Sequence, residues 1–463
     1  MFALSFLPSL ALFLLSAAPP ERLRGEGSDR RPTPLGKALA VALRQEAQAE
    51  VSLIPGSVLR ADADPADPTS IPRSVPPEPC VVGRATGSAI ARALAASASR
   101  AGPYLQTSGL LFDEGDLDAG DVRVGRFPLE AARSYRVACA GPLAGPLGLD
   151  PDAAPVPDLR TLAVRRLRVP PPPPFPPPPA AAPIERRLLG SGTRLGIERL
   201  LFPTALPSGF PENDRVPLTL FRPARGNGAG VLILPIWKGR DARIEEMMAR
   251  RLAEEGFLAA TMPLAFQYER AAPGVPSGDW TLSADVPRTR AALLQSVEDA
   301  RRAGDLLLAE GIAPERLAVL GASMGGHVAS AVYSVDERFR AGAFLLAGGD
   351  VAGSIWRASR ETAGIKAALV RAGVTREALE ESFRPFDPAT YATAARREGV
   401  FLVGALHDPV IPPENVEILW SAYGEPRLLW ISADHYSGIL FLPSLLGEVA
   451  EHFRRVLDLP PRR

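Results

Sequence analysis

From about residue 184 onward the chain alternates between short apolar runs and amphipathic stretches. The run Gly230-Val-Leu-Ile-Leu234 has no polar interruption, which is typical of a strand buried on both faces of a sheet. Between such runs, apolar residues recur every three or four positions, which predicts helices. The expected strands lie near residues 197–202, 216–221, 230–234, 257–262, 317–320, 343–346, 400–403 and 427–431, and the helices near 243–255, 287–310, 325–333, 414–421 and 444–457. This alternation favours a doubly wound α/β domain with a mostly parallel sheet over residues 184–463.

One interval between the predicted strands is longer than a single crossover connection requires. Residues 348–397 contain two short amphipathic pieces, at residues 365–372 and 376–383. Ligands of open α/β sheets bind outside the carboxyl ends of the strands. We therefore expect this segment to form a small helical cap over that edge.

A smaller domain precedes the α/β domain. Residues 33–150 mix helical periodicity with short strand-like runs, which predicts a compact α+β domain. Its expected helices lie at residues 35–50 and 87–100, and its expected strands at 51–54, 80–82 and 135–139.

A proline-rich linker is expected between the two domains, over residues 151–183. Nine of the ten residues in Pro170–Pro179 are prolines. Such a run adopts polyproline II and spans roughly 30 Å at about 3.1 Å per residue. The sequence therefore predicts a stiff spacer between two modules.

The chain begins with an apolar segment, residues 2–18, that ends in small residues and is followed by two prolines and charged residues. It is on the short side for a membrane span, and its small-residue exit is typical of a signal peptide. Residues 1–18 therefore predict export to the periplasm or the extracellular space. Because no Lys or Arg precedes the apolar run, an uncleaved segment that anchors the protein in a membrane is the alternative.

Composition changes the picture in two ways. The 463 residues are 46% hydrophobic, which is enough for two or three domains with cores of their own. Lys+Arg and Asp+Glu number 52 each, and no basic stripe stands out. This balance argues against nucleic acid and anionic membrane surfaces as partners. The sequence carries no signal for an oligomeric state.

The two cysteines of the chain, Cys80 and Cys139, both lie in the first domain. In an exported chain such a pair favours a disulfide. It would close a loop of about 60 residues and stabilise the domain by on the order of 4 kcal/mol. Two buried free thiols are the alternative.

The main chemical signal is Leu317-Ala-Val-Leu-Gly-Ala-Ser-Met-Gly-Gly-His327. An apolar strand leads into Gly321-Ala-Ser323-Met-Gly325, and a helix-compatible segment follows, which is the order of a nucleophile elbow. Glycine is required on both sides of the serine because a side chain there would collide with the neighbouring strand and helix. The motif predicts Ser323 as a nucleophile at a helix N-terminus.

A serine nucleophile needs a general base, and the base needs an orienting carboxylate. Among the four histidines, His435 directly follows the last predicted strand. Asp408, in Asp-Pro-Val-Ile-Pro412, follows the preceding strand. The order Ser, Asp, His, each residue at the end of a predicted strand, predicts a triad of Ser323, Asp408 and His435.

The remaining candidates receive structural roles. Asp350, after another strand, is the rival acid, whereas Asp434 adjoins the base too closely to orient it. We expect His327 to pack in the first turn of the elbow helix and His407 to point away from the acid. His452 lies among charged residues of the last helix, and we expect it to be exposed to solvent.

These motifs give residues 190–458 a resemblance to the α/β-hydrolase fold, and within it to members similar to dienelactone hydrolases and acyl esterases. In dienelactone hydrolases the nucleophile is a cysteine, whereas here it is Ser323. The resemblance implies a serine hydrolase that cleaves a small-molecule carboxylic ester or thioester through an acyl-enzyme. A serine peptidase of the same fold is the competing enzymatic hypothesis.

Such a reaction requires backbone donors for the oxyanion. One is expected to be the N–H of Met324. The resemblance implies a second in Leu234-Pro-Ile-Trp-Lys-Gly239, and because Pro235 has no N–H it is Ile236 or Trp237, with Trp237 preferred. The sequence contains no metal-ligand cluster, dinucleotide fingerprint or P-loop, so we expect no metal and no cofactor.

The first domain resembles the C-terminal domain of 5′-nucleotidases in segments that occur in the family's order. They are Leu35-Gly36, Val51-Ser-Leu-Ile-Pro-Gly-Ser-Val-Leu-Arg60, Val82-Gly-Arg-Ala-Thr-Gly87, Tyr104-Leu-Gln-Thr-Ser-Gly109 and Tyr135-Arg-Val-Ala138.

In that family the domain grips the nucleotide, and a separate metallophosphoesterase domain does the chemistry. Arg60 and Tyr104 match, which implies a weakened nucleoside site. Pro55 replaces the family's Asn, and the closing aromatic segment is replaced by residues 140–146. A purely structural domain is the alternative, and a non-catalytic binding protein with two relic modules is the third hypothesis for the whole chain.

Overall fold

The computed structural model describes residues 33–47, 49–59, 74–99, 104–111, 122–124, 127–152, 156–166, 185–357 and 359–460. The chain divides into two compact units, Met1–Val169 and Pro170–Arg463. The expected signal peptide and the polyproline segment lie outside the described residues. In the described part, none of the helices is both long and apolar enough to cross a membrane.

The first unit is built on a mixed five-stranded sheet with helices on both faces. α1 (Pro34–Glu46) and α5 (Leu159–Arg166) pack on one face, and α3 (Gly87–Ala98) and α4 (Ala144–Leu147) on the other. The strand order is β3 (Leu105–Ser108), β1 (Val51–Pro55), β7 (Ser134–Ala140), β2 (Cys80–Thr86) and β8 (Asp150–Pro151). Only the β1–β7 pair of this sheet is parallel. A small antiparallel sheet joins β4 (Leu110–Leu111), β5 (Arg123–Val124) and β6 (Phe127–Pro128).

Helix α5 falls inside the range that was expected to be a linker. Leu159 and Leu162 are fully buried, and they pack with Leu35 and Leu39 of α1. The first unit therefore extends past residue 150, and its last helix completes one of its two cores.

The predicted disulfide between Cys80 and Cys139 is wrong, since both thiols are free. In the antiparallel β2–β7 pair, Cys80 is opposite Ala140 and Cys139 is opposite Val81. Successive residues of a strand point to opposite faces, so this one-residue offset places the two sulfurs in different cores. Burial raises the pKa of both thiols to about 12.

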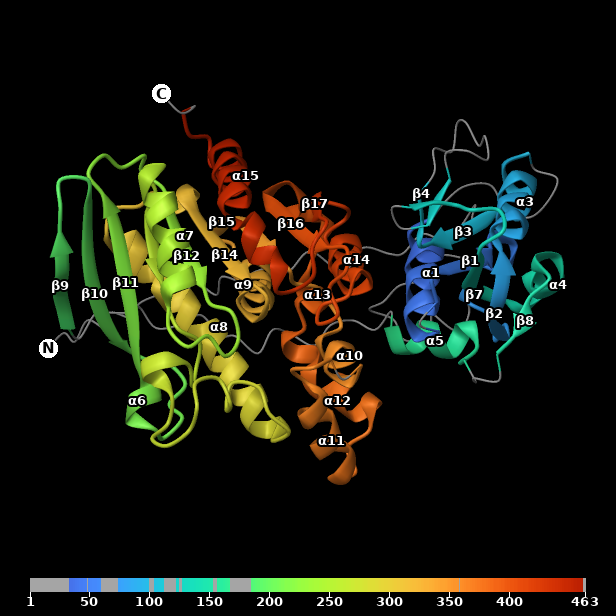
Figure 1. Ribbon diagram of the computed structural model, residues 1–463, viewed down its shortest axis with the longest axis horizontal. Helices are drawn as coiled ribbons and strands as arrows, with labels where there is room; N and C mark the ends of the chain where they lie inside the picture. The colour runs from blue at the N-terminus through green and yellow to red at the C-terminus, as the bar shows by residue number, and fades with distance from the viewer. Residues whose placement is uncertain are drawn as a thin grey trace, which may run out of the picture. The chain divides into compact units, whose positions relative to one another are not determined.

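The second unit contains a nine-stranded sheet (Figure 1). Six strands run parallel, and three antiparallel strands extend one edge. The order is β17 (Arg427–Ile431), β16 (Val400–Ala405), β15 (Phe339–Leu345), β14 (Leu317–Ala322), β12 (Gly230–Leu234), β13 (Leu258–Thr261), β11 (Arg215–Pro223), β10 (Leu195–Pro203) and β9 (Glu185–Ser191). The edge strand β9 was not predicted, because its sequence Glu-Arg-Arg-Leu-Leu-Gly-Ser lacks alternation.

Alternate residues of the parallel strands feed two cores. In β12, Val231 and Ile233 face one core, and Leu232 and Leu234 face the other. Helices α7 (Arg243–Glu254) and α15 (Leu442–Val456) cover the first face. Helices α8 (Val286–Ala309), α9 (Met324–Val335) and α14 (Pro413–Ala422) cover the second. The short helix α6 (Pro211–Asp214) lies in the β10–β11 connection. A sheet covered on both faces explains why its strands read as uninterrupted apolar runs.

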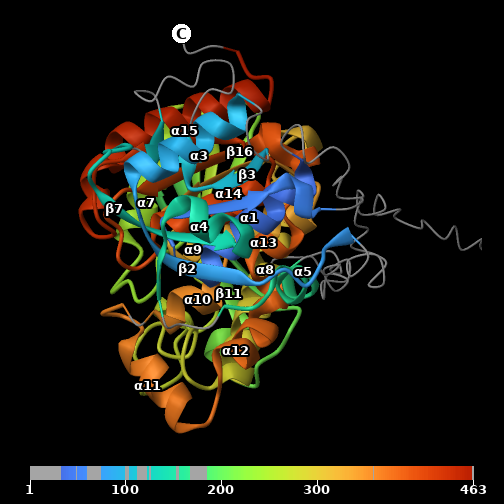
Figure 2. The same ribbon diagram turned by 90° about the vertical axis from the view of Figure 1, so that its right-hand side faces the viewer.

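Four helices form the cap between β15 and β16. They are α10 (Val351–Trp356), α11 (Ala363–Arg371), α12 (Arg376–Phe383) and α13 (Pro388–Tyr391). Figures 1 and 2 both show α10, α11 and α12 grouped at one end of the second unit. Leu369, Leu379 and Phe383 are buried in the core that also contains α8, so the cap is continuous with the body of this unit.

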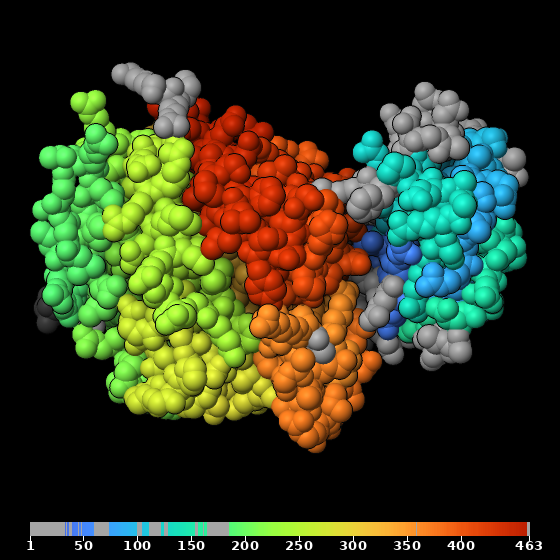
Figure 3. Space-filling model, viewed as in Figure 1, coloured from blue at the N-terminus to red at the C-terminus, as the bar shows by residue number. Residues whose placement is uncertain are grey.

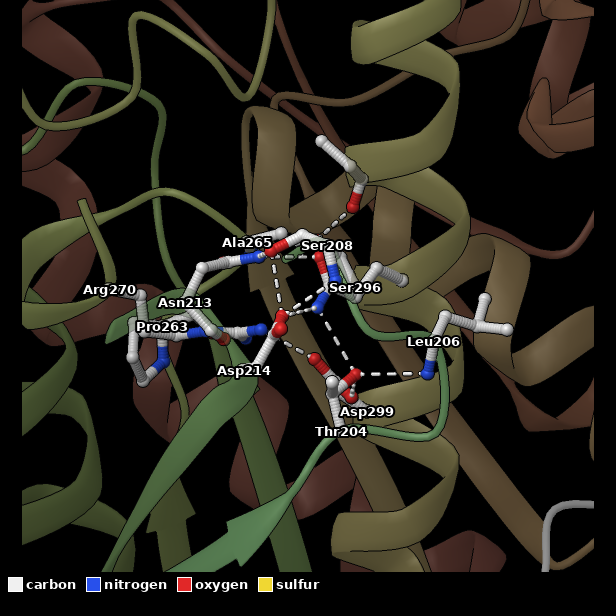
Figure 4. Close-up of polar contacts among 12 residues, drawn as sticks. Thr204, Leu206, Ser208, Asn213, Asp214, Pro263, Ala265, Arg270, Ser296 and Asp299 are labelled. Carbon is white, nitrogen blue, oxygen red and sulfur yellow. Dashed lines mark hydrogen bonds and ion pairs between the residues drawn. The ribbon is translucent and has the colours of Figure 1, made fainter. Parts of the chain in front are cut away.

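A buried polar network ties two connections and helix α8 of the second unit together (Figure 4). Arg270 and Asp299 form an ion pair of 2.7 Å, and both side chains are fully buried. The second carboxylate oxygen of Asp299 accepts from the Thr204 hydroxyl at 2.6 Å. Arg270 also donates to the carbonyl oxygens of Asn213 and Pro263. The network thereby fixes residues 263–270, which follow β13, against α8 and the β10–β11 connection.

We predict that Asp299→Ala lowers the free energy of unfolding by about 3–5 kcal/mol, because it leaves the Arg270 guanidinium buried without its counter-ion. Urea denaturation followed by far-UV circular dichroism measures this. The control is Glu398→Ala, which removes an ion pair with Arg397 whose Glu398 side chain is 85% exposed and costs less than about 1 kcal/mol. Equal losses in the two variants would contradict the prediction.

We also predict that a chain starting at Pro183 folds alone, because the cores of the two units contain no residue in common. Its unfolding midpoint in urea should match the midpoint of one of the transitions of the full-length chain. A truncated chain with a broad, non-cooperative transition would show that the second unit depends on the first.

Candidate active site

The turn after β14 has the backbone of a nucleophile elbow. Ser323 has φ 52° and ψ −121°, a conformation that L residues adopt only under strain. A Cβ on Gly325 would lie 2.6 Å from the Pro235 oxygen and closer still to that of Leu234, and one on Gly321 would lie 2.7 Å from the Gly326 nitrogen. Both glycines are therefore required by close backbone packing, as the motif predicted.

The structure brings Ser323, His435 and Asp408 into one hydrogen-bonded chain. The Ser323 Oγ lies 2.9 Å from the His435 Nε2, and the His435 Nδ1 lies 2.6 Å from the Asp408 Oδ2. The three residues follow β14, β17 and β16, so the carboxyl ends of three strands in the parallel part of the sheet bring them together. Because a carboxylate accepts from Nδ1–H, Nε2 is free to accept the serine proton.

Asp408 is held rigidly. Its side chain is fully buried, and its Oδ1 accepts from the backbone N–H groups of Val410 and Ile411, each at 2.8 Å. With the bond from His435, both carboxylate oxygens have donors. The carboxylate therefore has one orientation, which fixes that of the imidazole.

The two rival acids have other partners. Asp350 caps α10 by accepting from the Gly353 N–H at 3.0 Å. Asp434 accepts from the backbone N–H and the hydroxyl of Ser437, at 2.7 and 2.8 Å, in the turn after His435. Asp408 is the carboxylate that reaches the base.

Two of the other histidines are buried. His327 lies in the first turn of α9, where its Nε2 accepts from the Gly348 N–H at 3.4 Å. The expectation that His452 is exposed to solvent is wrong, since it is 1% exposed and bonds to the Gly399 carbonyl at 3.0 Å. His452 follows Leu445 by seven residues and Val449 by three, which places it on the buried face of α15.

The loop after β12 runs beside the elbow, because the Leu234 and Pro235 carbonyls contact Gly325. The N–H of Met324 stands at the first position of α9, where it has no acceptor within the helix. The N–H of Ile236 is engaged, since it donates to the Glu245 Oε1 at 3.3 Å. Among residues 185–357 and 359–460, no acceptor is found for the N–H of Trp237. Of the three N–H groups expected as oxyanion donors, only that of Ile236 has an acceptor in the described part of the second unit.

Sequence reasoning missed Glu245, although a signal was present. In α7, Glu245 precedes Met248, Ala249 and Leu252 by three, four and seven residues, and all four are buried. A carboxylate on the apolar stripe of an amphipathic helix indicates a specific buried partner. That partner is the loop after β12.

The nucleoside residues are only partly covered by the structure. Arg60 lies outside the described residues, and the carbonyl of Tyr104 accepts from the Gly56 N–H at 2.7 Å. Within the described ranges, no group of three or more His, Cys, Asp and Glu side chains is placed to hold a metal ion.

The surface of the second unit is hollowed where its yellow-green, orange and red segments meet (Figure 3). These colours mark segments after β12, the cap and the region that follows β17. A hollow bounded by such segments agrees with a site at the carboxyl edge of the sheet.

Neither a protein-family model nor a curated protein matches the sequence. Among solved structures, an acetyl xylan esterase from Paenibacillus sp. R4 is similar at 18% identity and a TM-score of 0.46, over 58% of this chain and 87% of that one. Acetyl xylan esterase 1 from Thermoanaerobacterium sp. JW/SL YS485 is similar at 16% identity and a TM-score of 0.41, over 57% of this chain and 88% of that one. A prolyl endopeptidase is similar at 14% identity and a TM-score of 0.41, over 59% of this chain and 40% of that one.

The topology of the second unit identifies its fold without these comparisons. The sheet has six parallel strands and an antiparallel edge, and crossover helices cover both of its faces. A serine stands in the turn after β14, and an aspartate and a histidine follow later strands. This is the α/β-hydrolase fold.

We predict that His452 makes the protein less stable at acid pH. Burial lowers its pKa from the ordinary 6.5 to about 4. Between these values the unfolded chain binds the extra proton, so stability falls as the pH is lowered through this window. The His452→Gln variant should lose about 2 kcal/mol less than the wild type between pH 7 and pH 5. Urea denaturation at the two pH values measures this, and identical losses would contradict it.

Proposed function

We propose that the protein is a serine hydrolase that cleaves a carboxylic ester or thioester through an acyl-enzyme. The observation that carries the proposal is the hydrogen-bonded chain from Ser323 through His435 to Asp408 on a strained elbow. Strain of this kind persists only where the surrounding structure over-determines it. The arrangement has a direct use, which is to present an activated hydroxyl at a helix N-terminus.

In the proposed mechanism, the Ser323 Oγ attacks the carbonyl carbon while the His435 Nε2 accepts its proton. The carbonyl oxygen becomes an oxyanion and accepts from the N–H groups of Met324 and Trp237. Collapse of the tetrahedral intermediate breaks the bond to the leaving group, which takes the proton from His435. A water molecule then attacks the acyl-enzyme with His435 as base, and the acid is released.

Asp408 holds His435 in the tautomer that this sequence requires. Its carboxylate accepts from Nδ1–H and stabilises the imidazolium that forms after each proton transfer. Esters and thioesters are the proposed class because an alcohol or thiol leaves more readily than an amine. A peptide substrate is the competing class.

We predict that Ser323→Ala abolishes labelling by a fluorophosphonate probe and turnover of p-nitrophenyl acetate. Asp408→Asn should keep the fold and lower kcat by about 10⁴-fold, because the amide stabilises the wrong tautomer of His435. Probe labelling on a gel and stopped-time esterase assays measure both effects. Undiminished labelling of the Ser323→Ala variant would rule out the assigned nucleophile.

The substrate class is tested on the wild type with short acyl esters, acyl thioesters and amino-acyl amides of matched leaving groups. Higher kcat/KM on the esters or thioesters supports the proposal. Higher kcat/KM on the amides would identify a peptidase instead. A wild type that reacts with no serine-directed probe would contradict catalysis altogether.

A further inference from the structure

The loop after β12 is held by a buried carboxylate from a different element. Glu245, in the first turn of α7, is 1% exposed. Its Oε1 accepts from the backbone N–H of Ile236 at 3.3 Å, and its Oε2 accepts from the hydroxyl of Tyr268 at 3.3 Å. Both acceptor oxygens are thus used, and one of them binds the residue directly before Trp237.

The Ile236 carbonyl is bound from the opposite direction. The amide nitrogen of Gln267 donates to it at 3.1 Å, and Gln267 is fully buried. The N–H and C=O of Ile236 are therefore both satisfied by side chains, one from α7 and one from the segment after β13. With Pro235 packed against Gly325, the backbone on either side of Ile236 has little freedom to rotate.

The groups that bind Ile236 are themselves braced. Positive φ angles occur at Lys238 (57°), Phe266 (62°) and Tyr268 (51°). Residues other than glycine adopt such a backbone only where the surrounding structure constrains them. Phe266 donates its N–H to the Asn213 Oδ1 at 2.8 Å, and Tyr268 donates its N–H to the Ser277 hydroxyl at 3.0 Å. The Ser277 hydroxyl in turn donates to the Gly239 carbonyl at 3.2 Å, which closes the loop at its far end.

The bracing continues into the buried network of Figure 4. Arg270 lies two residues after Tyr268, and its ion pair with Asp299 anchors this segment to α8. Trp237 is fixed as well, since its ring nitrogen donates to the Gly278 carbonyl at 2.8 Å. The orientation of the Trp237 peptide is consequently set by contacts that are complete before any substrate binds.

We propose that Glu245, supported by Tyr268, is a positioning residue that orients the second oxyanion donor. By accepting from Ile236, Glu245 removes that N–H from the site and holds the peptide before Ile236. Gln267 binds the Ile236 carbonyl and so holds the next peptide, whose N–H belongs to Trp237. Together these contacts present the N–H of Trp237 as the donor beside Met324. The inference rests on the proposed function, because an oxyanion hole matters only if Ser323 forms a tetrahedral intermediate.

The charges around Glu245 indicate why the carboxylate is costly to keep there. Burial raises its pKa, and the negative charge of Asp241 adds to this effect, while bonds from Ile236 and Tyr268 oppose it. Burial, followed by the charge of Glu245 and the bond to it, raises the pKa of Tyr268, and the carboxylates of Asp241 and Glu269 add smaller contributions. A carboxylate in such a place has a specific task, and its two donors are Ile236 and Tyr268.

The test is a comparison of Glu245→Ala with Glu245→Gln in the full-length chain. Misplacing an oxyanion donor costs about 10²-fold in kcat. We expect Glu245→Ala to lower kcat for p-nitrophenyl acetate about 100-fold with KM changed less than about threefold, because a donor to the transition state is lost. Glu245→Gln keeps an oxygen for the Ile236 N–H and should retain activity within about tenfold of the wild type.

Phenylboronic acid gives a readout that a general loss of stability does not move. It bonds to the serine Oγ as a tetrahedral anion and places an oxygen in the oxyanion hole. Its Kd should rise in Glu245→Ala by about the same factor as kcat falls. The matched control is Glu255→Ala, which removes another buried carboxylate at the end of α7 that pairs with Arg251 at 3.0 Å. That control should lower the melting temperature without changing kcat or this Kd.

Tyr268→Phe keeps the test decisive if Glu245→Ala does not fold. It removes only the hydroxyl that binds Glu245 and should lower kcat about tenfold with KM nearly constant. In the double variant the two effects should be less than additive, because both residues act through one contact. A Glu245→Ala enzyme with kcat within threefold of wild type, or with equal losses in the Gln and Ala variants, overturns the inference. If the fluorophosphonate probe does not label Ser323 in the wild type, the proposed function is overturned instead.

Discussion

The close approach of the first turn of α9 to the end of β12 is the constraint on which the active-site geometry depends. Gly325 contacts the carbonyl oxygens of Leu234 and Pro235 with no room for a side chain. The nucleophile turn and the loop that follows β12 therefore share one backbone contact, and neither moves without the other. The relation between Ser323 and the loop that carries Trp237 is set by this packing, because the interior of a protein is close-packed.

Directional polar contacts, rather than apolar packing, hold the loops around this contact. Apolar burial is non-directional and fixes how strands and helices stack, whereas a buried hydrogen bond also fixes the orientation of a peptide. Asp408 is oriented by two backbone N–H groups, the peptides before and after Ile236 by Glu245 and Gln267 respectively, and the segment after β13 by Arg270. Each of these groups would be costly to bury without its partners.

The parts that were predictable from the sequence are those that a local pattern encodes. Uninterrupted apolar runs predicted the parallel strands, and the glycines around Ser323 predicted the elbow, because backbone contact requires them whatever the rest of the fold. The order of Ser323, Asp408 and His435, each at the carboxyl end of a parallel strand, placed all three at one edge of the sheet. That order was enough to predict that Ser323 and His435 lie close together.

The remaining features depend on information that a single segment does not contain. The cysteine pair failed because the β2–β7 register, offset by one residue, is fixed by the whole sheet. The helix at residues 159–166 was hidden in a proline-rich surrounding, and strand β9 is exposed and does not alternate. His452 and Glu245 carried a readable signal in their helical spacing, but only the identity of their buried partners explains them.

The free thiols of the first unit have a consequence of their own. Because the sheet lies between the two sulfurs, they do not pair within the folded first unit, and an oxidising compartment adds no internal cross-link to this domain.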